Sequence, residues 1–278
     1  MIKIGNFNTL TVKDAVPFGF VLQHVGDDET VVLPTDNAPE DIDIGDILDV
    51  FVYPGEHGAL TASLKKPLAY LGETKVLKAV GVTEFGAFFD WGIERDLLVP
   101  SAYQDAPINE GMQYVVHVFY DDATQRLLGA TRLHYFLREK QVSVKADDDV
   151  ELLVYAKTDL GYKVVIDDTY LGLVFHSDAF KPLRIGQRTS GVIKQIRTDG
   201  KIDVILQRQN QEGRDALQQA ILDDLEAHGG ISSLTDKSPA EEIYARFNVS
   251  KGAYKKAIGA LYKQKKILLN KQSVKLLP

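Results

Sequence analysis

The feature that most constrains the fold is a unit that occurs three times along the chain. Three landmarks keep their spacing, with an offset of 66 or 67 residues between the first two copies and 75 between the last two. They are a glycine beside an apolar residue (Gly19, Gly86, Gly161), the end of an apolar pair (Pro34, Pro100, Phe175) and a glycine before a strand-like run (Gly45, Gly111, Gly186). Such self-similarity is the signature of a repeated domain.

Each copy contains short β-branched or aromatic runs separated by Gly, Pro, Asp and Asn. About five such strands in a unit of this size suit a small closed barrel of the oligonucleotide-binding (OB) type. An unbroken strand would place Phe85 and Phe88 on opposite faces. A glycine in a strand is typical of a bulge, so we expect one at Gly86–Ala87 that brings both rings to one face.

After residue 208 the pattern changes from strand-like to helical. We expect one helix over residues 211–228, a second starting at Ser238-Pro239, and a third capped by Ser250. Residues 267–277 resemble a short hairpin that turns near residues 270–273. Three helices followed by a β-wing form a winged helix, in which the third helix reads a nucleic-acid groove.

The expected fold is therefore a mainly β, multidomain chain of three tandem five-stranded OB barrels and an α+β winged-helix domain. The expected domains are residues 1–66, 67–140, 141–208 and 209–278.

Charge changes sign along the chain, although the whole protein carries a net charge of −7. By expected domain, the net charges are −7, −3, zero and +3, and from Ile243 onward there are nine basic residues and no acidic one. Phosphate contacts are thus expected toward the C-terminus. The acidic first copy would repel phosphate, which favours a structural or partner-facing role.

Several classes of function are disfavoured. The chain has no cysteine, which excludes disulfides, thiol catalysis and cysteine-bound metals. Phosphate-loop, metalloprotease and nucleophile-elbow motifs are absent, so we do not expect an enzyme. There is no signal-peptide-like start and no long apolar run, which favours a cytoplasmic protein without membrane association.

Longer motifs in the second and third copies are similar to a known RNA-binding domain. They are residues 86–92 and 96–100 in the second copy, and residues 157–166, 172–175, 180–186 and 196–204 in the third. These strings resemble the domain repeated in the largest protein of the small ribosomal subunit, called here the S-one domain. The whole chain resembles the bacterial conserved virulence factor B family, which combines three such barrels with a winged helix, and this resemblance implies no cofactor.

The resemblance implies positions for RNA contact. The RNA-facing aromatic positions of the domain fall on Phe85 and Phe88 in the second copy, on Phe18 and Phe20 in the first, and on Leu160 and Lys163 in the third. The usual histidine is replaced by Pro100 or Phe175, with His176 adjacent, and the late Asp and Arg match Asp121 and Arg126.

The candidate RNA-binding residues combine rings that could stack on bases with cations that could contact phosphates. They are Phe85, Phe88, Arg126, Tyr162, Lys163, Phe175, His176, Lys194, Arg197, Lys201, Lys251, Lys255, Lys256 and Lys263. For each ring the alternative is a place in the barrel core. For each cation the alternative is a solvated face.

We therefore expect a protein that binds single-stranded RNA with low sequence selectivity and regulates bacterial gene expression after transcription. Its candidate partners beyond RNA are the ribosome and the RNA-processing machinery. The alternatives are a DNA-binding transcriptional regulator that acts through the winged helix, and a protein-binding adaptor.

Overall fold

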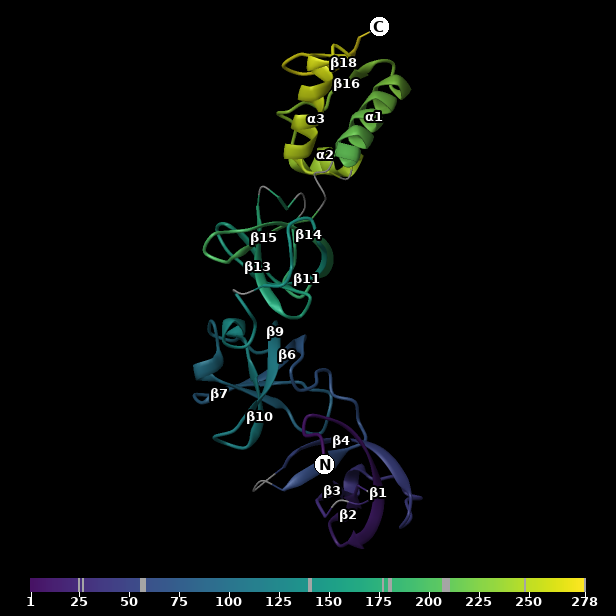
Figure 1. Ribbon diagram of the computed structural model, residues 1–278, viewed down its shortest axis with the longest axis vertical. Coiled ribbons are helices and arrows are strands. Elements are labelled where there is room, and N and C mark those ends of the chain that lie inside the picture. The colour runs from purple at the N-terminus through teal and green to yellow at the C-terminus, as the bar shows by residue number, and fades with distance from the viewer. Residues whose placement is uncertain are drawn as a thin grey trace. The chain divides into compact units, whose positions relative to one another are not determined.

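The computed structural model describes most of the chain (Figure 1). The described residues are 1–24, 26, 28–55, 59–139, 142–176, 178–179, 182–206, 211–247 and 249–277. The expected boundaries at 140/141 and 208/209, and residues 180 and 181 of the third copy, lie outside them. The chain divides into two compact units, Met1–Phe136 and Leu137–Pro278, which are described separately.

The first barrel is a closed five-stranded sheet with the strand order β1-β2-β3-β5-β4. Strands β3 and β5 pair in parallel, and the other neighbours are antiparallel. A short 3₁₀ helix, η1 (Thr35–Asn37), follows the third strand. The strands are β1 (Asn6–Val16), β2 (Gly19–Gln23), β3 (Thr30–Pro34), β4 (Ile47–Pro54) and β5 (Leu60–Ser63).

The third barrel, in the other unit, is closed with the equivalent order, β11-β12-β13-β15-β14. Its β13 and β15 form a parallel ladder over three residue pairs, from Gly172–Ile202 to Val174–Val204. The strands are β11 (Asp149–Lys157), β12 (Gly161–Ile166), β13 (Tyr170–Phe175), β14 (Arg188–Ile196) and β15 (Ile202–Ile205).

The second barrel has the same strand order, β10-β9-β6-β7-β8, but its sheet is open. No ladder joins β8 to β10 among the described residues, whereas side chains meet there: a Cβ added at Gly129 would lie 2.7 Å from Val99 Cγ2. Closure is thus confirmed for the first and third copies and is wrong for the second. The elements are β6 (Thr74–Val82), β7 (Gly86–Phe89), β8 (Leu97–Pro100), η3 (Ser101–Tyr103), β9 (Gln113–Asp121), β10 (Arg126–Ala130) and η4 (Leu133–Tyr135).

The first repeated glycine is required by a close approach between two backbones. A Cβ added at Gly19, Gly86 or Gly161 would lie only 2.2, 2.5 or 2.1 Å from a carbonyl oxygen of the facing strand. The expected bulge at Gly86–Ala87 is wrong, because β7 pairs regularly with β8. The register shift lies instead on the first strand of each copy, at residues 12–14, 79–81 and 154–156.

The second repeated glycine lies in a turn that holds this shift in place. Gly45, Gly111 and Gly186 have φ angles of +106°, +82° and +84°, a region that favours glycine. Their amides donate to the carbonyl oxygens of Val12, Ala79 and Val154, the last residues before each shift. The threefold repeat is therefore a repeat of backbone geometry.

The first barrel has a core of its own, and a second cluster extends from its β4 into the second barrel. Phe51 and Tyr53 of β4 pack in the same buried cluster as Phe89 and Trp91 of the second barrel. The Phe51 and Trp91 rings lie edge to face, with centroids 5.4 Å apart. The third barrel and the winged helix each have a core of their own.

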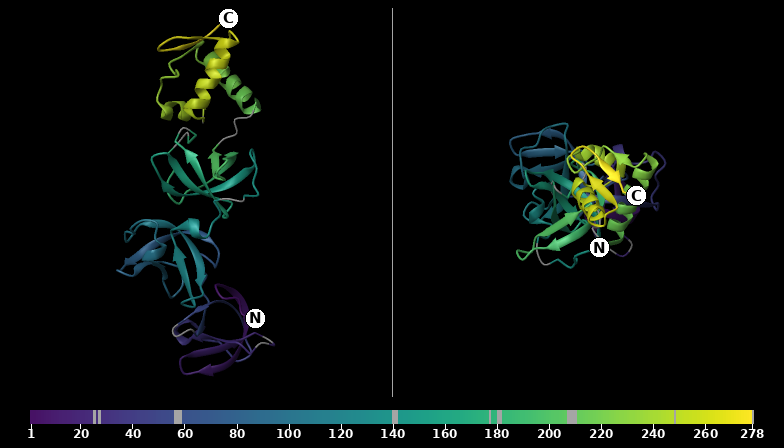
Figure 2. Two further views of the ribbon diagram at one scale, coloured as in Figure 1. Left: turned by 60° about the vertical axis from the view of Figure 1, so that its left-hand side comes forward. Right: turned by 90° about the horizontal axis from the view of Figure 1, so that it is seen from above.

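The C-terminal domain has the predicted three helices, α1 (Gln211–Ala227), α2 (Ala240–Phe247) and α3 (Lys251–Lys263). Figure 2 shows α1 beside α3, consistent with their packing. Ser250 caps α3 by accepting a hydrogen bond from the Ala253 amide, as predicted. The predicted hairpin forms the wing, and an unpredicted strand completes its sheet in the order β16-β18-β17. These strands are β16 (Ile231–Ser232), β17 (Ile267–Leu269) and β18 (Val274–Leu276).

Candidate nucleic-acid interface

Each barrel presents an exposed apolar side chain just before its second strand. Phe18, Phe85 and Leu160 are 67%, 75% and 66% exposed. In each copy a residue after the third strand fixes this turn by donating its amide to the carbonyl oxygen of the exposed residue: Thr35, Ser101 and His176 respectively. The same scaffold thus holds an aromatic ring in the first two barrels and a leucine in the third.

Phe88 lies on β7 of the second barrel, where it is half-buried and opposite Leu98 of β8. Its equivalents by position are Val21 in the first barrel and Lys163 in the third. Phe20, named as an RNA-facing candidate, corresponds instead to Ala87 and packs against the core of the first barrel. The exposed ring of Phe85 and the partly exposed ring of Phe88 therefore distinguish the second barrel.

Phe88 and Arg126 line one hollow in the second barrel. Its cavity volume is about 170 Å³, and it also contacts Tyr53 and Pro54 of β4, Arg95, Asp96 and Leu98. Within the described residues, neither Arg95 nor Arg126 forms an ion pair. Sequence patterns gave no sign of a site at Tyr53, Arg95 and Asp96, since only the fold brings these segments together.

Asp96 is the one acidic residue that lines this hollow. Burial, and secondly the negative charge of Asp90, raises the pKa of Asp96 above its ordinary value. The hollow thus contains rings, two guanidinium groups and one carboxyl group.

In the third barrel, the candidate ring Tyr162 belongs to the core. It is 5% exposed and has no free face for a base. Alternation along β12 explains this, since Tyr162 points inward and Lys163 points outward. Lys163 Nζ lies 6.0 Å from the centre of the Tyr155 ring. His176 Nε2 is 3.0 Å from the Thr158 carbonyl oxygen.

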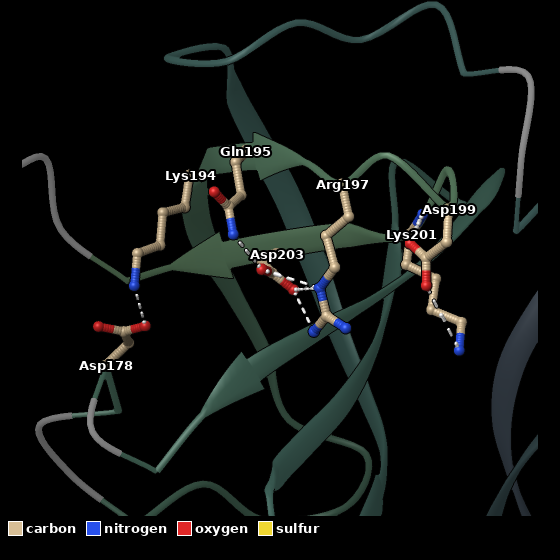
Figure 3. A network of polar contacts seen from close by, with 7 residues as sticks. All are labelled: Asp178, Lys194, Gln195, Arg197, Asp199, Lys201 and Asp203. Atoms are coloured by element: carbon tan, nitrogen blue, oxygen red, sulfur yellow. Dashed lines mark hydrogen bonds and ion pairs between the residues drawn. The ribbon is translucent and has the colours of Figure 1, made fainter.

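Phe175 and Arg197 contact each other on the outer face of the third barrel. The Arg197 guanidinium lies 5.5 Å from the centre of the Phe175 ring, within the range of a cation–π interaction. The same guanidinium holds the buried Asp203 carboxylate, with Nη2 at 2.7 Å and Nε at 2.9 Å, and Gln195 donates to Asp203 at 2.7 Å (Figure 3). Arg197 therefore contacts both the Phe175 ring and the Asp203 carboxylate.

The pKa of Asp203 reflects these contacts. Burial by itself would raise it, but the hydrogen bonds from Arg197 and Gln195 and the charges of Arg197 and Lys194 outweigh burial. The pKa of Asp203 therefore lies below its ordinary value, and the carboxylate is stabilised as an anion.

The two other candidate cations on this barrel also have acidic neighbours. Lys194 Nζ lies 2.8 Å from Asp178, and Lys201 Nζ lies 4.0 Å from Asp199 (Figure 3). Each side chain that we expected to contact phosphate in the third barrel, apart from Lys163, thus lies beside a carboxylate. These pairs reduce the positive potential of the face.

The winged-helix domain presents its candidate lysines along α3. Lys255, Lys256 and Lys263 are exposed and Lys251 is half-buried, while Tyr254, Ile258 and Leu261 face the core as predicted. Lys255 lies 4.0 Å from Asp236. The candidate residues therefore do not converge in one site: they lie on the second barrel, the third barrel and α3.

Fold and surface together define a class: S1-type OB barrels in tandem with a winged-helix domain. Residues 4–65 match the S1 domain, which is the S-one domain named above. Residues 219–276 match the CvfB-like winged helix domain.

Similar proteins extend the resemblance to nearly the whole chain. It is 27% identical over 288 residues to the protein YitL of Bacillus subtilis (strain 168), covering 96% of this chain and 91% of the relative. It is 25% identical to conserved virulence factor B of Staphylococcus epidermidis, with 94% and 91% covered. The resemblance to the conserved virulence factor B family is thereby confirmed.

Among solved structures, a multidomain protein with nucleic acid binding domains from Streptococcus pneumoniae matches with a TM-score of 0.42 and 22% identity. The match covers 99% of this chain and 98% of the other.

In the described part of this chain, none of the helices has the length and apolar character needed to cross a membrane.

Proposed function

We propose that this protein binds single-stranded RNA with low sequence selectivity and regulates bacterial gene expression after transcription. The observation that supports this is a pair of rings on the second barrel: Phe85, 75% exposed just before β7, and the half-buried Phe88 of β7, which lines a hollow with Arg126. Unpaired bases stack on such rings whatever their sequence, with about 1–3 kcal/mol for each base.

The electrostatic contribution comes mainly from two places. Arg95 and Arg126 of the second barrel have no ion pair among the described residues, and α3 carries four candidate lysines. The third barrel contributes less, because three of its four candidate cations lie beside aspartates. Contacts to the backbone carry no sequence information, which agrees with low selectivity.

Single strands, rather than duplexes, fit the barrels. Stacking on Phe85 and Phe88 requires bases that are not already stacked in a helix. The match of residues 4–65 to the S1 domain supports the same ligand class. A binder of unpaired RNA acts on transcripts rather than on genes, which is the basis for the proposed regulatory role.

The test is a titration of a labelled, unstructured 12-nucleotide RNA with the intact protein, followed by fluorescence anisotropy at several salt concentrations. We expect binding that weakens as salt rises, because phosphate contacts release counterions. Absence of binding in dilute buffer would overturn the proposal.

A second candidate function is binding of duplex DNA through the winged helix. Its specific support is the basic face of α3, in a segment without acidic residues from Ile243 onward. A 12-base-pair DNA duplex in the same titration distinguishes the two, since tighter binding of the duplex would favour α3 as the reader. Failure of both ligands would leave the protein-binding adaptor, for which the acidic first barrel is the candidate surface.

A further inference from the structure

The second barrel has a hollow where β8 and β10 face each other without a ladder in the described part of the chain. The equivalent strands of the third barrel, β13 and β15, are paired, so that edge is closed. In the third barrel, β13 and β15 pair in parallel through the ladder that includes Leu173 and Asp203. In the second barrel, β8 and β10 have no such ladder among the described residues, and Leu98 of β8 and Arg126 of β10 line the hollow instead. The edge that forms a ladder in the third barrel therefore lines a hollow in the second.

The first barrel completes the wall of this hollow. Tyr53 and Pro54, at the end of β4, line it together with Trp91 of the second barrel. Tyr53 is 6% exposed, and among the described residues its hydroxyl has no hydrogen-bond partner. Both Tyr53 and Trp91 belong to the core that the two barrels share, so their positions are fixed by packing.

The size of the hollow fits one base. Its volume of about 170 Å³ equals that of roughly six water molecules in the liquid. A space of this volume is large enough for one planar ring near Phe88 and Leu98, but not for a helix or a folded peptide. Pockets that bind flat ligands combine apolar walls with a few polar groups in this way.

The polar groups of the hollow differ in what they can recognise. The Asp96 carboxylate accepts hydrogen bonds and repels phosphate, so it favours a neutral donor such as an amino group. The Arg95 and Arg126 guanidinium groups favour phosphate oxygens. One acceptor and two cations therefore suit a base that carries an amino group, together with the phosphates on either side of it.

We propose that this hollow takes one unpaired base with an exocyclic amino group, which donates to Asp96, while Arg95 and Arg126 contact the flanking phosphates. The preference rests on the proposed binding of single-stranded RNA and refines it. A single such position among several unselective contacts gives a modest preference, consistent with low overall selectivity. Cytosine and uracil form the sharpest comparison, because they have the same ring size and differ at this group.

The experiment compares nine-nucleotide oligo(C) and oligo(U) RNA of equal length and charge, each titrated with the intact protein at pH 7.5. Phosphate contacts are the same for both, so the ratio of the dissociation constants isolates the base. We expect oligo(C) to bind about fivefold more tightly, as for one hydrogen bond to a charged group at a partly exposed site.

Substitutions in and outside the hollow test whether the preference for oligo(C) arises there. Asp96→Ala is expected to bring the ratio of the two dissociation constants to about one, because oligo(C) loses its hydrogen bond to the carboxylate while oligo(U) loses no attractive contact. The matched control is Asp105→Ala, which removes an exposed carboxylate from the same barrel outside the hollow and should keep the ratio. Arg126→Gln should weaken both oligonucleotides about threefold without changing the ratio.

The outcomes separate the two proposals. If both oligonucleotides bind but wild type shows no preference for oligo(C), or if Asp96→Ala keeps that preference, the base pocket is overturned and RNA binding stands. If neither oligonucleotide binds in dilute buffer, the proposed function itself fails. The fluorescence of Trp91, the single tryptophan of the chain, checks that Asp96→Ala leaves the shared core intact.

Discussion

The second and third barrels have the same strand order and the same repeated glycines, yet their outer faces differ. The second has an open edge, an exposed Phe85 and two arginines without ion pairs among the described residues. The third has a closed edge, and its Arg197 covers Phe175 and binds Asp203. Strand order therefore does not determine whether the aromatic and charged groups of a face are available to a ligand or are already paired with other side chains of the protein.

The polar groups along this edge also differ between the two barrels. Asp203 of β15 lies beside Leu173 of β13 and accepts from Arg197 and Gln195, so the polar groups at that edge are paired within the protein. In the second barrel, β10 has Leu127 and Leu128 at the corresponding edge, and no carboxylate of the described residues pairs with Arg126.

The largest effect is expected from adding a methyl group at Gly86 or Gly161, the repeated glycine that lies against a carbonyl oxygen of the facing strand. Gly161→Ala should lower the free energy of unfolding by about 3 kcal/mol and Gly86→Ala by about 2 kcal/mol. The loss is larger at Gly161 because the closed third barrel, unlike the open second barrel, cannot spread to relieve the clash. Hydrogen exchange of the intact chain, read separately over β7 and β12, measures both. Gly81→Ala is the control, since its Cβ would meet nothing within 4 Å. Equal effects would show that closure does not stiffen the barrel.

The next effect concerns binding by the second barrel. Phe85→Ala combined with Phe88→Ala should weaken binding of single-stranded RNA by about 2 kcal/mol, roughly 30-fold, through lost stacking. Fluorescence anisotropy measures the affinity, and Trp91 fluorescence reports on folding. Phe18→Ala is the control, because Phe18 is a similarly exposed ring in the acidic first barrel. Unchanged affinity in the double variant would remove the second barrel from the interface.

A smaller effect is expected from breaking the internal pair of the third barrel. Asp203→Asn should lower the free energy of unfolding at pH 7 by about 1.5 kcal/mol, less than for a fully buried pair because the Arg197 side chain is 32% exposed. The folded-state pKa of Asp203 is lowered, so this stabilisation is present above the unfolded-state pKa and is lost as pH falls through the folded-state pKa. Urea unfolding followed by circular dichroism should therefore show variant and wild type converging in acid. A constant gap would assign the loss to packing.

The smallest effect tests where the remaining phosphate contacts lie. Lys255→Glu with Lys256→Glu should weaken RNA binding by about 1 kcal/mol and flatten its salt dependence, because two cations leave α3. The affinity is measured from 50 to 200 mM salt, a range of about fourfold. Lys3→Glu with Lys66→Glu changes the net charge equally in the first barrel and serves as the control. An unaltered slope in the α3 variant would exclude the winged helix from the interface.

Local patterns predicted much of the fold. The repeat, the helices and the Ser250 cap could be read from the sequence, because glycine spacing, helical periodicity and capping act over a few residues. The bulge was placed on the wrong strand, since the clash that Gly86 avoids is with a carbonyl group of β8 and not within its own strand. Tyr162 and Lys163 were both named as surface candidates, although neighbouring residues of one strand point to opposite faces, and the structure places Tyr162 in the core.

By itself, the sequence determined the repeated barrel geometry, the winged helix and the gradient of charge, because these depend on residue type and spacing along the chain. Only the tertiary structure decided which cations are engaged by aspartates, which edge stays open, and that Tyr53 joins Phe88 and Asp96 around one hollow. The physical reason is that ion pairs, closing ladders and cavities form between segments that are distant in sequence, and packing alone sets their distances.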